Sequence, residues 1–118
     1  MKHAMISLLL CSAALLSPVA HAQAGAVEVR GDDTGMRLQV DGEDFLVRGV
    51  NWNYTPAGKN YSYSLWSQPD HFVERVLHEH MRLLKDMGVN AIRQFSTVPP
   101  RWVKWIHERY GIYTVINH

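Results

Sequence analysis

Hydrophobic and polar positions follow two different periods along this chain. Between residues 27 and 40 apolar and polar side chains alternate, interrupted by turn-forming residues, which is typical of paired β-strands. Asp41-Gly42 comes directly afterwards and is a strong signal for a two-residue hairpin turn. The pattern therefore predicts a short antiparallel hairpin element over residues 27–48, which leads into a more buried strand ending near Trp52.

Apolar residues then recur at three- and four-residue intervals, which predicts a helix over about residues 69–87. Ser67 and Asp70 have the spacing of a capping box, with Ser67 as the N-cap residue. Gly88 stands where a helix commonly ends on a glycine. Between the first strand and this helix lies a long loop that is rich in aromatic side chains: Tyr54, Tyr61, Tyr63 and Trp66.

A strand, a second helix and a third strand are predicted after Gly88. The strand covers residues 89–95, and Pro99-Pro100 opens a helix that ends at Gly111. Residues 112–116 are rich in β-branched side chains and predict the last strand. Strands that alternate with helices in this way indicate parallel pairing through right-handed crossovers. No helix follows the last strand to cover it, so we expect the chain to be the beginning of a larger protein.

The first 22 residues have the organisation of an export signal. Lys2 precedes an apolar stretch that is too short to span a membrane, and Ala20-His21-Ala22 is a small-x-small cleavage pattern. We expect cleavage after Ala22 and a periplasmic or extracellular protein that has no membrane anchor afterwards. The predicted organisation is a signal peptide (1–22), a tether with the hairpin element (23–44) and an α/β domain (45–118).

Composition excludes several functional classes. The 118-residue chain has 12 basic and 11 acidic residues, so its charge gives no reason to expect nucleic acid as a partner. Its single cysteine, Cys11, lies in the predicted signal and excludes a disulfide framework or a multi-cysteine metal site. His78 and His80 are two positions apart on a predicted helix, so they cannot chelate one metal, and we expect both on a solvated face. We predict neither a metal nor a cofactor.

Three runs of residues, in order, resemble the entry to the catalytic domain of family 2 glycoside hydrolases. They read VDGEDFLVRGVN at residues 40–51, MRLLKDMGVNAIR at 81–93 and RYGIY at 109–113. Family 5 enzymes and β-1,3-glucanosyltransferases start in a similar way. At the end of the third strand, family 2 enzymes usually carry acidic residues, whereas this chain has His118, which is closer to some family 5 patterns.

The resemblance implies the N-terminal part of a (β/α)8 TIM barrel, with about three of its eight strands. It implies hydrolysis of O-glycosidic bonds in a carbohydrate substrate, with the general acid/base and the nucleophile beyond His118. The chain alone is then expected to be inactive, because glycoside hydrolysis normally needs two carboxyl groups beside the scissile bond.

The same resemblance implies roles for residues at the ends of the predicted strands. Asn51 and Trp52 would line the sugar site, although packing in the core at the end of the strand is the alternative for Trp52. Arg93 would hold the nucleophile carboxylate ionised, although a structural salt bridge is the alternative for Arg93. Tyr54 and the other aromatic residues of the loop would either form a platform beside the site or cover the open end of the barrel. His118 would either contact substrate or lie at a disordered chain end.

Two alternative functions remain open from the sequence. One is a non-catalytic secreted module that binds glycans through its aromatic loop. The other is a glucan transglycosylase, which would need the same two carboxylates as a hydrolase.

Overall fold

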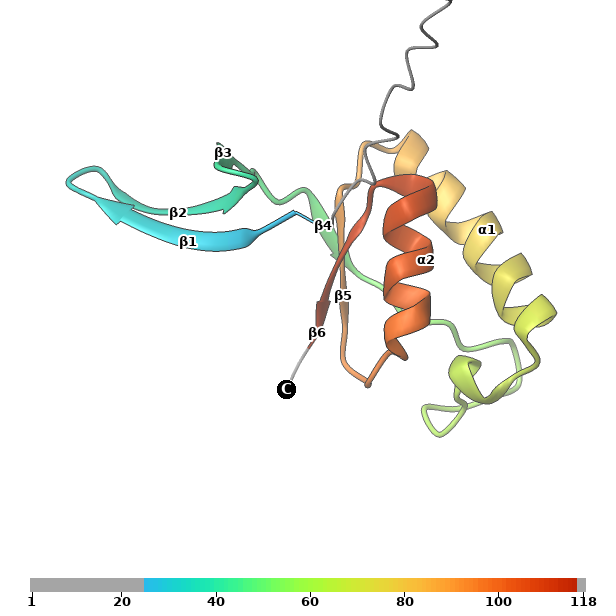
Figure 1. The fold of residues 1–118 in the computed structure, drawn as a ribbon. Helices are drawn as coiled ribbons and strands as arrows, with labels where there is room; N and C mark the ends of the chain where they lie inside the picture. Colours follow the sequence, from blue (N-terminus) through green and yellow to red (C-terminus); the bar gives the residue numbers. More distant parts are fainter. Residues whose placement is uncertain (1–24, 117–118) are drawn as a thin grey trace, which may run out of the picture. The chain divides into compact units, whose positions relative to one another are not determined.

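The computed structural model describes residues 25–116, and both the predicted signal peptide and His118 lie outside that range. The chain divides into two compact units, one up to Asp44 and the other from Phe45 onward. The first unit contains the strands β1 (Val27–Asp32), β2 (Gly35–Val40) and β3 (Glu43–Asp44). The second contains β4 (Gly49–Asn51), the 3-10 helix η1 (Leu65–Ser67), α1 (Asp70–Asp86), β5 (Ala91–Gln94), α2 (Pro100–Tyr110) and β6 (Tyr113–Ile116) (Figure 1).

The first unit is an antiparallel sheet in the order β1-β2-β3. Val27 lies opposite Val40 and Val29 opposite Leu38, so the apolar residues of both strands share one face. The turn predicted at Asp41-Gly42 connects β2 to β3, and both of its residues have positive φ, at 53° and 83°. A type I′ turn requires this conformation, and its twist matches that of the strands it joins.

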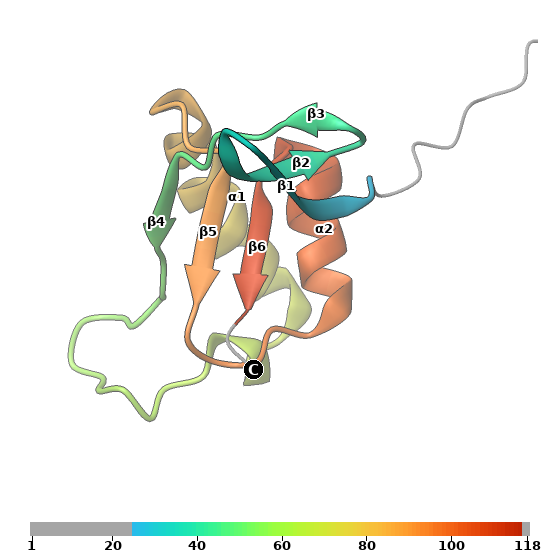
Figure 2. The ribbon, with the colours of Figure 1, turned by 90° about the vertical axis from the view of Figure 1, so that its left-hand side faces the viewer.

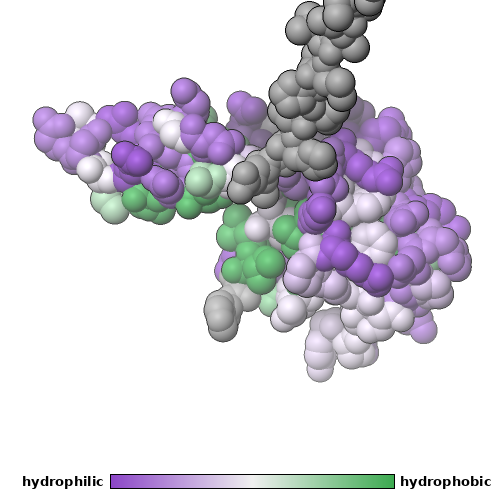
Figure 3. All heavy atoms as spheres, viewed as in Figure 1, coloured by the Kyte–Doolittle hydropathy of each residue, from purple (hydrophilic) through white to green (hydrophobic). Residues whose placement is uncertain are grey.

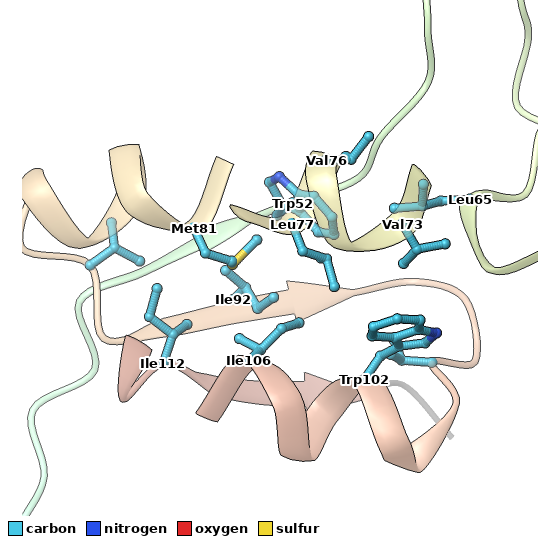
Figure 4. Close-up of a cluster of buried hydrophobic side chains, with 12 residues drawn as sticks. Trp52, Leu65, Val73, Val76, Leu77, Met81, Ile92, Trp102, Ile106 and Ile112 are labelled. Atoms are coloured by element: carbon cyan, nitrogen blue, oxygen red, sulfur yellow. The ribbon is translucent and has the colours of Figure 1, made fainter. Parts of the chain in front are cut away.

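The second unit is a parallel sheet in the order β4-β5-β6, with α1 and α2 on the same face (Figures 1 and 2). Ile92 of β5 lies between the two helices and the sheet, where it faces Leu77 and Met81 of α1 and Ile106 of α2 (Figure 4). All four of these side chains are fully buried. Because the apolar stripe of each helix packs on the same side of one central strand, this layer is the hydrophobic core of the unit.

The start of α1 differs from the capping box expected from the sequence. The helix begins at Asp70, its N-cap residue is Pro69, and no side chain caps it. The Asp70 carboxylate instead accepts two hydrogen bonds from Arg101 of α2, at 2.8 and 3.0 Å. The prediction of Ser67 as N-cap was therefore wrong, because an ion pair with another helix takes the carboxylate that the capping box would use.

The other helix ends agree with the sequence. Pro100 stands in the first turn of α2, where its missing N–H costs no hydrogen bond. Gly111 ends this helix in the left-handed conformation, with φ at 64°, and its N–H donates to the carbonyl of His107. Gly88 follows α1 with φ at 79°. Glycine adopts this backbone region without the steric cost that other residues have.

The predicted (β/α)8 barrel fragment is wrong. The described residues form two small three-stranded sheets, one antiparallel and one parallel, together with two helices. Barrel closure depends on the tilt and stagger of all its strands, and these are properties of the whole sheet. Alternating strands and helices dictate parallel pairing between neighbours, but they do not dictate that the sheet closes.

Candidate functional site

A hollow lies on the face of the parallel sheet that α1 and α2 do not cover. Its volume is about 430 Å³. Most of its lining is backbone and small apolar side chains: Val47, Gly49, Val50, Ala91, Ile92 and Val115. Two polar side chains complete the lining, those of Asn51 and Arg93. The hollow is therefore an apolar surface with two groups that can make directed hydrogen bonds.

Strand register explains why Asn51 and Arg93 meet. Asn51 of β4 is the direct neighbour of Arg93 in β5, and Val115 of β6 follows in the same row. Neighbours in register project to the same face of a parallel sheet. The strands are joined at this level by the backbone N–H of Trp52, which donates to the carbonyl of Arg93 at 3.0 Å.

Arg93 is further positioned by an aromatic ring. Its guanidinium lies over the ring of Phe95, 4.4 Å from the ring centroid. Phe95 comes two residues later, just beyond the end of β5, and 61% of it is exposed. This cation–π contact places the guanidinium at the edge of the hollow.

The uncovered face carries exposed apolar side chains. Val47 and Val115, which both line the hollow, are 47% and 48% exposed. Figure 3 shows hydrophobic side chains gathered on the side of this unit that carries the strands. No aspartate or glutamate lines the hollow. The described residues therefore provide no carboxylate pair for glycoside hydrolysis at this place.

Trp52 lies on the opposite side of the sheet from Asn51. Only 7% of it is exposed, and it packs against Trp66 with a distance of 6.4 Å between ring centroids. Its indole N–H donates to Nδ1 of His80 in α1, at 3.1 Å. Successive residues of a strand point to opposite faces, so Trp52 cannot line the same hollow as Asn51.

Tyr54 also lies apart from the hollow. Its ring contacts Tyr63, Phe72 and His80, with centroid distances of 6.1, 6.2 and 5.5 Å. Tyr54, Tyr63 and Trp66 all pack against the core, and Tyr61 is the member of the predicted aromatic set that is almost fully exposed. Tyr54, Tyr63 and Trp66 therefore lie against the core of this unit and do not form a platform of exposed rings.

His80 was not among the residues predicted for a site, and the solvated face expected for it is wrong. It is half-buried and contacts both Trp52 and Tyr54. The sequence contained a signal for this position, since His80 continues the helical stripe of Val73, Val76 and Leu77 at intervals of three and four residues. His78 is exposed, but its Nδ1 lies 2.6 Å from the hydroxyl of Tyr110 in α2.

Ionisable groups with perturbed pKa values lie elsewhere. A hydrogen bond from the Thr34 hydroxyl is the main reason why the pKa of Asp32 is lowered, and a hydrogen bond from Gln39 lowers the pKa of Asp44. Burial raises the pKa of Tyr110 in α2. None of these groups lines the hollow, so their shifts reflect local hydrogen bonding and burial rather than a catalytic arrangement.

Neither a metal cluster nor a membrane span is found in the part of the chain that the structure describes. No group of three or more histidine, cysteine, aspartate or glutamate side chains in that part could hold a metal ion. No helix there is long and apolar enough to cross a membrane. The chain matches no protein family, no curated protein and no solved structure with which it was compared.

Proposed function

We propose that this chain contributes the carbohydrate-binding part of a glycoside hydrolase, and that the chain itself binds carbohydrate without cleaving it. The single observation that supports binding is the pairing of Asn51 with Arg93 in a hollow with apolar walls. Sugars present hydroxyl groups around a weakly polar ring, and such ligands need a few convergent hydrogen-bonding groups on an apolar surface. The link to glycoside hydrolases rests on the three ordered sequence runs at residues 40–51, 81–93 and 109–113.

The absence of cleavage follows from the chemistry of the hollow. Hydrolysis uses one carboxyl group as acid and a second as nucleophile or base, about 5 Å apart in retaining enzymes and wider in inverting ones. The hollow has a cation and an amide instead. Asn51 and Arg93 can orient a sugar by hydrogen bonds, but neither provides the carboxyl chemistry of the reaction.

Binding is tested by titrating the full chain with cellohexaose and laminarihexaose and following backbone amide and side-chain resonances by NMR. We expect shifts at Asn51, Arg93 and their strand neighbours. Asn51→Ala should weaken binding about 10-fold, the effect of losing one good hydrogen bond to a ligand. Asn53→Ala is the matched control, because Asn53 is exposed, lies two residues away and does not line the hollow.

Two results would count against this proposal. If neither oligosaccharide perturbs the hollow at millimolar concentration, the carbohydrate-binding role is wrong. If the purified full chain releases reducing sugar, and Asn51→Ala does not affect the rate, cleavage occurs with groups outside this hollow. Formation of longer oligosaccharides in the same assay would instead support the transglycosylase alternative.

We also propose that the protein is exported, to the periplasm or outside the cell, after removal of residues 1–22. The support is the charged start, the short apolar stretch and the Ala20-His21-Ala22 pattern. N-terminal sequencing of the protein secreted by a bacterial host should give Gln23 as the first residue. Recovery of the intact N-terminus from the cytoplasm would contradict export.

A further inference from the structure

Strand β1 forms an outer edge of the antiparallel sheet in the first unit. The strand order is β1-β2-β3, so among the described residues only β2 pairs with β1 (Figure 1). All six residues of β1 are exposed. A strand of this length with one unpaired edge can bind a further strand through its free backbone N–H and C=O groups. The edge of β1 is therefore a surface for strand addition.

The register between β1 and β2 determines which backbone groups face outward. Asp41 donates its backbone N–H to the carbonyl of Ala26 at 3.0 Å, and this pair extends the register of the two strands by one position. Hydrogen-bonded and non-hydrogen-bonded positions alternate along an antiparallel pair. The even-numbered residues of β1 therefore bond to β2. The residues whose N–H and C=O groups face the outer edge are Val27, Val29 and Gly31.

The side chains of β1 carry two opposite charges that are placed symmetrically about Val29. Glu28 and Arg30 project to the same face, where a guanidinium nitrogen of Arg30 lies 3.0 Å from the Glu28 carboxylate. Both side chains are more than half exposed. The other face of the strand is apolar, with Val27 and Val29 both largely exposed. The strand is thus complementary in charge to an antiparallel copy of itself.

We propose that two copies of this chain dimerise through β1, which pairs with β1 of the second copy in antiparallel orientation about a twofold axis at Val29. In this register Val29 lies opposite Val29, and Val27 lies opposite Gly31. Glu28 of each copy lies opposite Arg30 of the other. The contact is symmetric and closed, as in most homodimers. It does not depend on the carbohydrate function proposed above.

Charge selects this register over its neighbours. The strands can slip by two residues in either direction and still pair through the same outward-facing backbone groups. One slip places Glu28 opposite Glu28, and the other places Arg30 opposite Arg30. Like charges directly opposite one another destabilise a strand pair, whereas opposite charges stabilise it. These side chains also occupy non-hydrogen-bonded positions of the new pair, where side chains on neighbouring strands are closest.

The size of the contact indicates how strong the dimer is. One pair of short strands is small beside the roughly 1,200–2,000 Å² that stable protein complexes bury. We therefore expect a reversible dimer that forms at high protein concentration. Because the paired charges are exposed, added salt should weaken it.

The test is sedimentation equilibrium of the full chain, together with amide NMR, between about 20 μM and about 2 mM, which spans affinities typical of weak complexes. The mass should rise from that of one chain towards that of two. In the dimer the N–H groups of Val27, Val29 and Gly31 become hydrogen-bonded, so their exchange with solvent should slow as the concentration rises. The N–H groups of Glu28 and Arg30 already bond to β2 and should change less.

Charge-exchange variants identify the partner strand. Glu28→Arg and Arg30→Glu each place like charges at both contacts between the copies, so each should weaken self-association about 10-fold or more. An equimolar mixture of the two variants restores opposite charges at both contacts and should form a heterodimer. The ion pair within each strand stays broken in the mixture, so repair of the hairpin cannot explain the recovery.

Glu43→Arg is the matched control. It makes the same change of charge as Glu28→Arg, but Glu43 is an exposed residue of β3, which lies at the other edge of the same sheet. Self-association of this variant should equal that of the natural chain. A loss as large as that of Glu28→Arg would mean that net charge, rather than the charges of β1, controls the association.

Three results would overturn the proposal. One is a chain that stays monomeric at about 2 mM, the upper end of the range for weak complexes. Another is a dimer that both β1 variants leave unchanged, or that their mixture does not recover. The third is a set of concentration-dependent shifts confined to Val47, Val115 and their neighbours, which would place the contact on the uncovered face of the parallel sheet instead.

Discussion

Leu77 allows the strongest test of the core that α1 and α2 form on the sheet. Its side chain is fully buried, and it lies beside Met81 and Ile92 in the hydrophobic cluster. Leu77→Ala removes three carbon atoms from a position with no solvent contact, and such changes cost about 2–5 kcal/mol through lost burial and the remaining cavity. A unit of roughly 70 residues has a total stability of only about 4–10 kcal/mol, so this single change should remove a large part of it.

The assay is urea denaturation followed by circular dichroism of the two helices. With a urea dependence of about 1–1.5 kcal/mol per M, a loss of about 2–5 kcal/mol in Leu77→Ala should lower the midpoint by about 1.3–5 M, or leave the unit unfolded without urea. Leu83→Ala makes the same chemical change in the same helix, but Leu83 is 50% exposed. It should cost less than about 1 kcal/mol.

Equal losses for Leu77→Ala and Leu83→Ala would refute the assignment of the buried face of α1. A cost below about 1 kcal/mol for Leu77→Ala would refute the close packing of the cluster. Both substitutions raise helix propensity by a similar small amount, so propensity cannot explain a difference between them.

Three other predictions concern α2 and its ends. Gly111→Ala should cost about 1 kcal/mol in the same urea assay, because residue 111 has φ at 64°; a neutral result would mean that α2 ends differently. The Asp70–Arg101 ion pair is bidentate, but both side chains are more than half exposed. A double-mutant cycle should therefore give a coupling free energy of about 0.2–1 kcal/mol that becomes smaller in high salt. A larger coupling that does not depend on salt would contradict this prediction. Burial raises the pKa of Tyr110 in the folded protein, so the neutral phenol stabilises the folded state relative to the phenolate. This stabilisation is fully present below the pKa of about 10 that tyrosine has in the unfolded chain, and it is lost as pH rises through the raised pKa of the folded protein. Tyr110→Phe should therefore flatten the loss of stability above about pH 10, and an unchanged alkaline slope would contradict it.

The sequence predicted only some of the side chains that line the candidate site. Asn51 and Arg93 were both selected, and the register of β4 and β5 brings them together. Trp52 was grouped with Asn51, yet it points to the helix side of the sheet. Strand alternation separates consecutive residues, so the period of the strand already argued against a shared role for these two side chains.

Local elements were determined by the sequence itself. The turn at Asp41-Gly42, the proline at the start of α2 and the glycine after it all act through the backbone of a few adjacent residues. Such signals depend on steric limits on φ and on one or two hydrogen bonds, which are the same in any fold. The order of strands and helices after residue 49 follows from hydrophobic periodicity, which is also local.

Only the tertiary structure decided which distant side chains pair with one another and how the strands are arranged. The Asp70 carboxylate pairs with Arg101 instead of capping its own helix, and His80 accepts a hydrogen bond from Trp52 across 28 positions of sequence. The open three-stranded sheet replaces the expected barrel for the same reason. Partners that are distant in sequence compete for a side chain or a strand edge, and the outcome depends on packing free energies that no short pattern contains.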